Sequence, residues 1–399
     1  IIVYTDITDL KQSNIGTEEI FTNQTGETKI AGNKMFVYFD GNHLNLRQKI
    51  REGIATVYFN NMLFGSGIQE IIQNALLLNL PEWYKSGIIA YAATSWDAAA
   101  ENELRDIWNS DEKYQNFERL ANDYPKIAGR SFWFFIEQVY GKSTITNLLY
   151  LTKISRSMEN SFVYILNAEP KVIQKDWNIF YSNYYRSEQH KLDDNRDKKE
   201  IILLDKKIKK GASISQIKIN PQGTSLVYTV NELGKYRIIV HDLITGKENV
   251  IFRYGFKNIF QETDFNYPLI AWHPEKEEMT YVYEHRDVLH LVRYNVTNGE
   301  KIDQIIPEEF QRIYSISYAG DDEYILSATT DGWSDLYRYN YKKRNQTRLT
   351  EDFYDDLDAS YITLGNEKGI LFSSNRQIDS IYPMKLDTIL PVNTFDVYF

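Results

Sequence analysis

Residues 214–252 read ISQIKINPQGTSLVYTVNELGKYRIIVHDLITGKENVIF and contain four short apolar runs separated by turn sequences. Pro221-Gln-Gly223 and Thr245-Gly246 are two of these turns. Short runs of β-branched and aromatic residues between such turns predict antiparallel strands. The same order returns three more times, with equivalent strands at Leu226, Met279, Tyr324 and Ile370, spaced 53, 45 and 46 residues apart. Four short strands per repeat of this size are typical of β-propeller blades.

The composition of the whole chain limits the classes of protein that it can be. It has 399 residues, of which 43% are hydrophobic and 25% charged, as in soluble globular proteins. No apolar run approaches 18 residues, which argues against a membrane-spanning helix. The net charge of −10 argues against nucleic acid as the main partner. The absence of cysteine excludes disulfides and Cys-ligated zinc.

The four repeats resemble the blades of TolB-like propellers. The matching pieces are Asn220-Pro-Gln-Gly223, His273-Pro-Glu-Lys276, Val240-His-Asp-Leu-Ile-Thr-Gly246 and Arg348-Leu-Thr350. The resemblance covers residues 210–399, where we expect about four blades of an incomplete ring. It implies a periplasmic, outer-membrane-associated protein of a Gram-negative bacterium.

The first half of the chain has a different periodicity. After a strand at 34–40, apolar residues recur every three or four positions from Leu44 to Gly65, which predicts a helix. We expect its buried face to hold Leu46, Ile50, Ile54, Val57, Tyr58 and Met62. Further helices are expected at 67–78, 81–93, 98–108, 113–122, 128–140, 143–151, 155–167 and 170–188. Residues 1–190 are thus predicted to form an α/β domain with a helical subdomain, followed by a charged linker at 191–209.

One motif in this half suggests a specific chemistry. The stretch Leu80-Pro-Glu-Trp-Tyr-Lys-Ser-Gly-Ile-Ile-Ala-Tyr91 resembles the second motif of gluzincin metallopeptidases of the peptidase MA type. The resemblance implies a gluzincin-like fold, with a third zinc ligand at position 86 and a His-Glu-x-x-His helix upstream. Two histidines four residues apart share one helix face, where they bind zinc, and the glutamate between them polarises a zinc-bound water.

The ligand positions implied by this resemblance hold other residues. Arg51 and Ala55 replace the two histidines, Ser86 replaces the third ligand, and only Glu52 is retained. None of the three replacements provides an imidazole or carboxylate donor for zinc. We therefore predict a pseudo-peptidase with no metal, no cofactor and no peptidase activity. Glu52 is either a retained catalytic base or, as we favour, a carboxylate paired with Arg51 or Lys49.

Family geometry also implies that the helices carrying Glu52 and Ser86 pack side by side, with both side chains facing one cleft. In the second half, Asp352, Asp355, Asp356 and Asp358 form an acidic cluster that is either a calcium site or, as we favour, a solvated loop between blades. The helical spacing of Trp177, Phe180, Tyr181, Tyr184 and Tyr185 predicts a core face.

Together these patterns predict a non-catalytic binding or scaffold protein of the cell envelope, with an inactive peptidase-like domain and a propeller. Its expected partners are other envelope proteins, in an outer-membrane complex. Two alternatives remain: a zinc metallopeptidase with ligands supplied from elsewhere, and a glycan- or peptidoglycan-binding protein that uses the many aromatic side chains.

Overall fold

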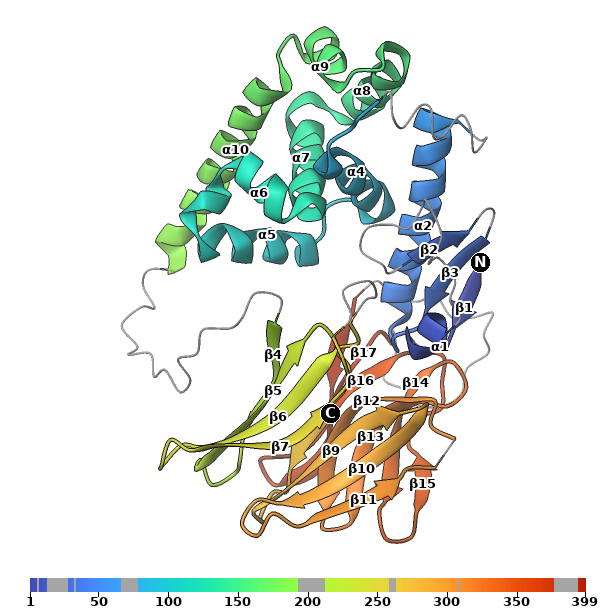
Figure 1. The fold of residues 1–399 in the computed structure, drawn as a ribbon, viewed down its shortest axis with the longest axis vertical. Helices are drawn as coiled ribbons and strands as arrows, with labels where there is room; N and C mark the ends of the chain where they lie inside the picture. Colours follow the sequence, from blue (N-terminus) through green and yellow to red (C-terminus); the bar gives the residue numbers. More distant parts are fainter. Residues whose placement is uncertain are drawn as a thin grey trace. The chain divides into compact units, whose positions relative to one another are not determined.

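The computed structural model describes residues 1–5, 7–12, 28–31, 34–65, 78–192, 212–257, 263–307, 309–376 and 394–399. The chain divides into two compact units (Figure 1). The helical unit comprises residues 18–35 and 47–201, together with Ile1. The propeller unit comprises residues 2–17, 36–46 and 202–399. A segment near the start of the chain therefore groups with blades that follow it by more than 150 residues.

The chain begins with a small sheet in the strand order β1-β3-β2. Its elements are β1 (Ile2–Tyr4), α1 (Ile7–Gln12), β2 (Thr28–Ala31) and β3 (Lys34–Tyr38). β1 runs parallel to β3, and β3 buries every side chain after its first residue. The strand predicted at 34–40 is thus confirmed.

Helix α2 (His43–Phe64) confirms the helix predicted from Leu44 to Gly65, but the predicted buried face is wrong. Ile54 and Tyr58 are 42% and 73% exposed. The buried residues are instead Lys49, Glu52, Gly53, Thr56, Phe59, Leu63 and Phe64. These positions also recur every three or four residues, so the helix buries a neighbouring face that includes an ion pair to another helix.

Most of the remaining predicted helices are confirmed. They are α4 (Glu82–Thr94), α5 (Ala98–Ser110), the 3₁₀ turn η1 (Glu112–Gln115), α6 (Phe117–Asp123), α7 (Pro125–Tyr140), α8 (Lys142–Ser155), α9 (Met158–Leu166) and α10 (Pro170–Leu192). The helix expected at 113–122 is divided at Asn116, whose side chain accepts a hydrogen bond from the Arg119 amide and caps α6. The stretch 67–78 lies outside the described residues except for its last residue, and the linker outside them beyond Leu192.

The core of the helical unit depends on a close crossing of α4 and α7. A Cβ placed on Gly129 would lie 1.8 Å from the Trp83 carbonyl oxygen, and one on Gly87 would lie 2.3 Å from the Gly129 backbone. Only glycine at both positions allows the two backbones to approach so closely. Around this crossing, α10 contributes the fully buried rings of Trp177 and Tyr181, which confirms its predicted aromatic core face. On the same helix, Tyr184 is 43% exposed, so that face is narrower than predicted.

Four antiparallel sheets follow. Blade one contains β4 (Ala212–Ile219), β5 (Ser225–Glu232), β6 (Lys235–Asp242) and β7 (Glu248–Tyr254). Blade two contains β8 (Leu269–Trp272), β9 (Glu278–His285), β10 (Val288–Asn295) and β11 (Lys301–Ile305). Blade three contains β12 (Arg312–Gly320), β13 (Glu323–Thr329), β14 (Ser334–Asn340) and β15 (Asn345–Arg348). Blade four contains β16 (Asp356–Leu364), β17 (Glu367–Ser374) and β18 (Asp396–Tyr398).

The sheets form a four-bladed, propeller-like array, as the repeats predict. The first strand of each blade contacts the first strand of the next, from β4 through β8 and β12 to β16. Side chains between successive blades form shared apolar clusters, such as Val227 of blade one with Met279 and Tyr281 of blade two. The fourth repeat also predicts a strand at 380–386, which lies outside the described residues.

Candidate functional site

The four positions singled out by the peptidase resemblance lie on two helices of the helical unit. Arg51 is exposed on α2, and Ala55 is partly buried one turn later. Ser86, on α4, is partly buried, and its hydroxyl donates to the Glu82 carbonyl oxygen at 2.8 Å within the same helix. A serine that bonds its own helix in this way has satisfied its donor locally.

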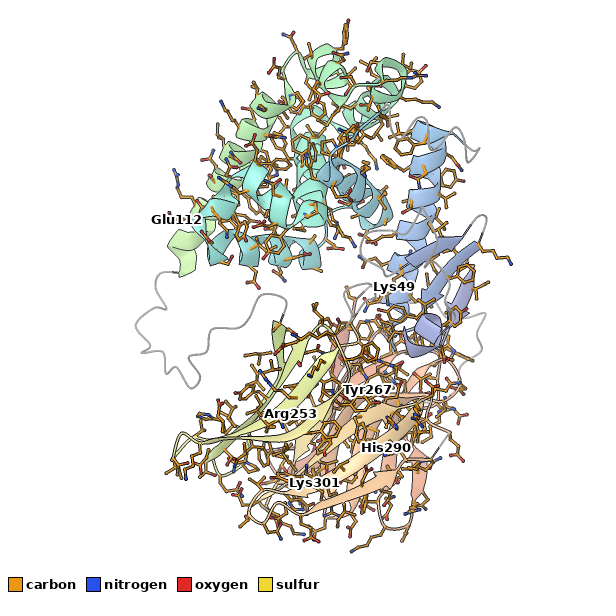
Figure 2. The ribbon with its side chains drawn as sticks, in the orientation of Figure 1. Lys49, Glu112, Arg253, Tyr267, His290 and Lys301 are labelled. Carbon is orange, nitrogen blue, oxygen red and sulfur yellow. The ribbon has the colours of Figure 1, made fainter. Side chains whose placement is uncertain are left out.

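Glu52 is only 2% exposed and is paired with a cation from another helix. The Nζ atom of Lys126, on α7, lies 2.9 Å from Oε1 and 3.1 Å from Oε2 of this carboxylate. From the sequence we expected Arg51 or Lys49 as the partner, and the structure places Lys126 beside the carboxylate. Lys49, which is labelled in Figure 2, is itself buried. Both oxygens of Glu52 thus face an ammonium group. The packing of α2 against α4 and a shared cleft for Glu52 and Ser86 remain predictions.

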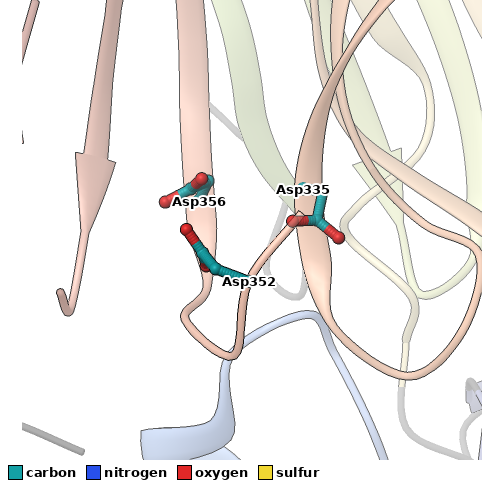
Figure 3. Close-up of side chains that lie close together, drawn as sticks. All are labelled: Asp335, Asp352 and Asp356. Carbon is teal, nitrogen blue, oxygen red and sulfur yellow. The ribbon is translucent and has the colours of Figure 1, made fainter. Parts of the chain in front are cut away.

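A second group of acidic side chains is buried in the propeller unit. Asp335 on β14, Asp352 between β15 and β16, and Asp356 at the start of β16 each place a carboxylate oxygen within 4.8 Å of the others (Figure 3). Within the described ranges, no other three histidine or acidic residues meet so closely. Asp352 is 4% exposed and Asp355 is fully buried, so the predicted solvated loop is wrong. Of the four predicted residues, Asp358 is the exposed one.

Two arginines explain how this loop can be buried. Nη2 of Arg376 lies 2.7 Å from both oxygens of Asp356 and 3.1 Å from Oδ2 of Asp352. Arg348 donates to Oδ2 of Asp335 and also pairs with the exposed Asp331. Buried carboxylates tolerate loss of water when charge-assisted hydrogen bonds replace it. Arg348 thus neutralises the carboxylate of blade three, and Arg376 neutralises those of blade four and of the loop that leads into it.

Burial also changes the proton affinity of these carboxyl groups. Loss of hydration raises the pKa of Asp335 to about 7, an effect that the Arg348 guanidinium only partly offsets. The same cause, with the nearby charge of Asp356, raises the pKa of Asp352 to about 6. The pKa of Asp355 is also raised by burial, against the lowering effect of His43.

The chemistry of this cluster suits an internal ion-pair network better than a cation site. Three carboxylates resemble a hard-cation ligand set. Here, however, two guanidinium groups already occupy positions beside the same oxygens. Each arginine satisfies carboxylate oxygens that a metal ion would need, and it adds positive charge next to the site. We therefore propose no metal at this cluster.

Several residues of this region were missed by sequence reasoning. Asp335 stands in an otherwise strand-like run, Arg376 follows the second strand of its repeat, and His43 lies more than 290 residues upstream of both. A charged residue next to a buried strand was the available signal for the first two. Nothing local marked His43, whose ring nitrogen lies 2.6 Å from Asp355.

The fold and these sites define a chain with a helical unit and a propeller-like unit, and the propeller-like unit contains buried ion pairs. No helix of the described ranges combines the length and apolarity needed to cross a membrane. No protein-family model matches the chain.

A curated protein and several solved structures are similar to the chain. The Tol-Pal system protein TolB of Helicobacter hepaticus is 31% identical over 155 residues, which are 39% of this chain and 34% of that protein. The matched part is thus about a third of that relative's length. TolB from Acinetobacter baumannii matches at 14% identity with a TM-score of 0.31, covering 46% of this chain and 42% of that one. The propeller domain of the Trilobed protease from Pyrococcus furiosus matches at 8% identity with a TM-score of 0.28, covering 48% and 58%.

Proposed function

We propose that this chain is a non-catalytic, protein-binding component of the Gram-negative cell envelope, similar in role to a Tol-Pal system protein. The observation that carries the proposal is the 31% identity over 155 residues to TolB of Helicobacter hepaticus. The four-bladed array supports it, because a β-propeller offers a wide, rigid surface made of loops. On this proposal the chain is periplasmic, associates with the outer membrane and binds other envelope proteins there.

The helical unit is, on the same proposal, a pseudo-peptidase of the gluzincin type. A gluzincin needs zinc to lower the pKa of bound water and to polarise the peptide carbonyl. Arg51, Ala55 and Ser86 supply none of the usual ligands. The one retained residue, Glu52, is buried against Lys126 and is therefore poorly placed to accept a proton from water. These residues and contacts argue against catalysis by the unit.

The test separates binding from catalysis in the native host. An epitope-tagged chain is expressed at its normal level, cells are fractionated, and cross-linked partners are purified and identified. We expect the chain in the periplasmic and outer-membrane fractions, cross-linked in constant ratio to an envelope protein. Elemental mass spectrometry of the purified protein is expected to find no stoichiometric zinc, and peptide libraries are expected to stay uncleaved.

A matched variant gives the control. Glu52→Gln removes the carboxylate of a peptidase but keeps the size of the side chain, and Lys126 is exposed enough to be rehydrated. We expect this variant to retain the same partner and the same cellular phenotype. Stoichiometric zinc, or peptide cleavage lost in Glu52→Gln, would overturn the proposal, as would a purely cytoplasmic location.

A further inference from the structure

The propeller unit holds a short segment of its own chain, Phe39–His43, against the seam between blades three and four. The carbonyl oxygen of Gly41 accepts a hydrogen bond from the Ser334 hydroxyl at 2.7 Å. Gly41 has a φ of +89°, and a Cβ at this position would lie 2.4 Å from the ring of Tyr314. Glycine is therefore required here both by the backbone conformation and by the aromatic ring against it.

His43 makes the second half of this contact. Its backbone N–H donates to Oδ2 of Asp355 at 2.6 Å, and its Nδ1 atom lies 2.6 Å from Oδ1 of the same carboxylate. Its ring stacks on Trp333 with the centroids 4.0 Å apart. Because His43 is the first residue of α2, Asp355 also places a negative charge at the start of that helix. One buried carboxylate thus recognises an imidazole and a helix start together.

The side chains that receive the segment are held by the blades themselves. The Asp355 amide donates to Oδ1 of Asn375 at 2.9 Å, and the ring of Trp333 lies 5.7 Å from that of Phe353. The Ser334 hydroxyl lies 3.3 Å from that of Thr329. We call the set Tyr314, Trp333, Ser334 and Asp355 the seam site. A site oriented by its own surroundings binds a ligand with less loss of conformational entropy than a mobile one.

The grouping of the chain sets this segment apart from ordinary core packing. Residues 36–46 belong to the propeller unit, whereas residues 18–35 and 47–201, on either side, belong to the helical unit. The segment thus belongs to the propeller unit although its flanking residues do not, and two polar side chains and two aromatic rings of the seam site hold it there. None of the described blade strands includes it, so its release leaves the ladders of blades three and four intact.

We propose that the seam site is a peptide-binding site which the chain occupies with its own Phe39–His43 segment. A partner protein that presents a glycine turn followed two residues later by a histidine at a helix start displaces that segment. The proposal rests on the proposed function, because it names the surface through which a protein partner binds. Three groups of the partner are recognised. Its glycine carbonyl accepts a hydrogen bond from Ser334, its histidine ring stacks on Trp333, and the backbone N–H and imidazole of that histidine both contact Asp355.

The test uses a fluorescently labelled synthetic peptide with the sequence of residues 36–46 and the full chain. In the unmodified chain the tethered segment competes at a high effective concentration, so binding of the free peptide is expected to be weak. The variant Gly41→Ala frees the site, since its Cβ meets Tyr314. We expect peptide anisotropy titrations to show saturable binding to Gly41→Ala that is at least about tenfold tighter than to the unmodified chain.

Matched variants assign this binding to the seam site. Adding Asp355→Asn to Gly41→Ala is expected to abolish binding, whereas adding Asp358→Asn, an exposed carboxylate bonded to Ser373, is expected to leave it unchanged. A peptide with alanine in place of histidine is expected to bind weakly to every chain. Hydrogen exchange provides the folding control: the segment's amides are expected to exchange faster in Gly41→Ala while those of β13 and β14 stay protected.

His43→Ala serves as a second opened variant if the alanine at position 41 unfolds the chain. The proposal fails if the peptide does not bind a folded, opened variant in a saturable way, or if Asp355→Asn leaves binding unchanged. Loss of peptide binding with the envelope partner still captured would reject the seam site alone. Peptide binding without any envelope partner would reject the proposed function and retain the site.

Discussion

Substitution of Asp335 by asparagine is expected to remove a large part of the pH dependence of propeller stability. Burial raises the pKa of this carboxyl group from its ordinary value near 4 to about 7 in the folded chain. A folded-state pKa above the unfolded one means that the folded protein binds the proton more tightly. The free energy of unfolding therefore rises as the pH falls from 8 towards 5. With these two pKa values, linkage gives about 2–3 kcal/mol between pH 8 and pH 5 from this group.

The asparagine keeps the shape of the side chain and cannot take up that proton. Arg348 retains its contacts to Asp331 and Glu351, so the variant is expected to fold. Urea unfolding at pH 5, 6, 7 and 8, followed by circular dichroism of the strands, is the assay. The unfolding free energy of Asp335→Asn is expected to change with pH by about 2 kcal/mol less than that of the unmodified chain.

A matched control separates burial from loss of an ion pair. Asp331→Asn removes another partner of the same Arg348, at a side chain that is 55% exposed. It is expected to leave the pH dependence unchanged, since an ion pair with so exposed a carboxylate adds little to the stability of the fold. All three proteins share their other ionisable groups, so the contributions of those groups cancel in the comparison. Equal pH dependence in Asp335→Asn and the unmodified chain would refute the argument that burial holds this carboxyl group near neutrality.

Three further predictions concern the helical unit. Lys126→Ala removes the ammonium group beside the buried Glu52 carboxylate and is expected to lower the free energy of unfolding by about 3 kcal/mol. Adding Glu52→Gln is expected to restore much of this loss, and additive losses in the double-mutant cycle would contradict the pairing. Gly129→Ala is expected to lower the melting temperature sharply because its Cβ meets the Trp83 carbonyl. Gly141→Ala places its Cβ in open space and is expected to lower the melting temperature less, despite the positive φ of Gly141. Equal decreases for the two variants would disprove the close crossing of α4 and α7. The triple substitution Arg51→His, Ala55→His and Ser86→Glu is expected to create a zinc site measurable by elemental analysis, and failure of a folded triple variant to bind zinc would count against the gluzincin resemblance.

Much of the fold was predictable because its signals are local. Alternation and turns mark each strand of the first three blades, and the equivalent positions Leu226, Met279 and Tyr324 are all buried. Helix starts were harder to predict than helices. Ser157 caps α9 through the Asn160 amide, so this helix begins at Met158, three residues later than expected. Such a boundary depends on a single side-chain hydrogen bond, which hydrophobic periodicity does not report.

The candidate sites were predictable only as residue types. The peptidase-like motifs located Glu52 and Ser86, yet the cation that pairs with Glu52 comes from Lys126, 74 residues away. The acidic run at 352–358 was visible, but it was expected in solvent. Its burial depends on Arg376, which no spacing rule connects to it.

The amino-acid sequence by itself determined the two kinds of structure in this chain, the helices of the first half and the repeated strands of the second. Apolar residues recur every two positions in a strand and every three to four positions in a helix because of backbone geometry, so both patterns can be recognised from residues close together in the sequence. Only the tertiary structure decided which face of α2 is buried, how Asp335, Asp352 and Asp356 come together, and that His43 packs on Trp333. The physical reason is that burial of a charge or a polar backbone group requires a partner, and here each partner comes from a distant part of the chain.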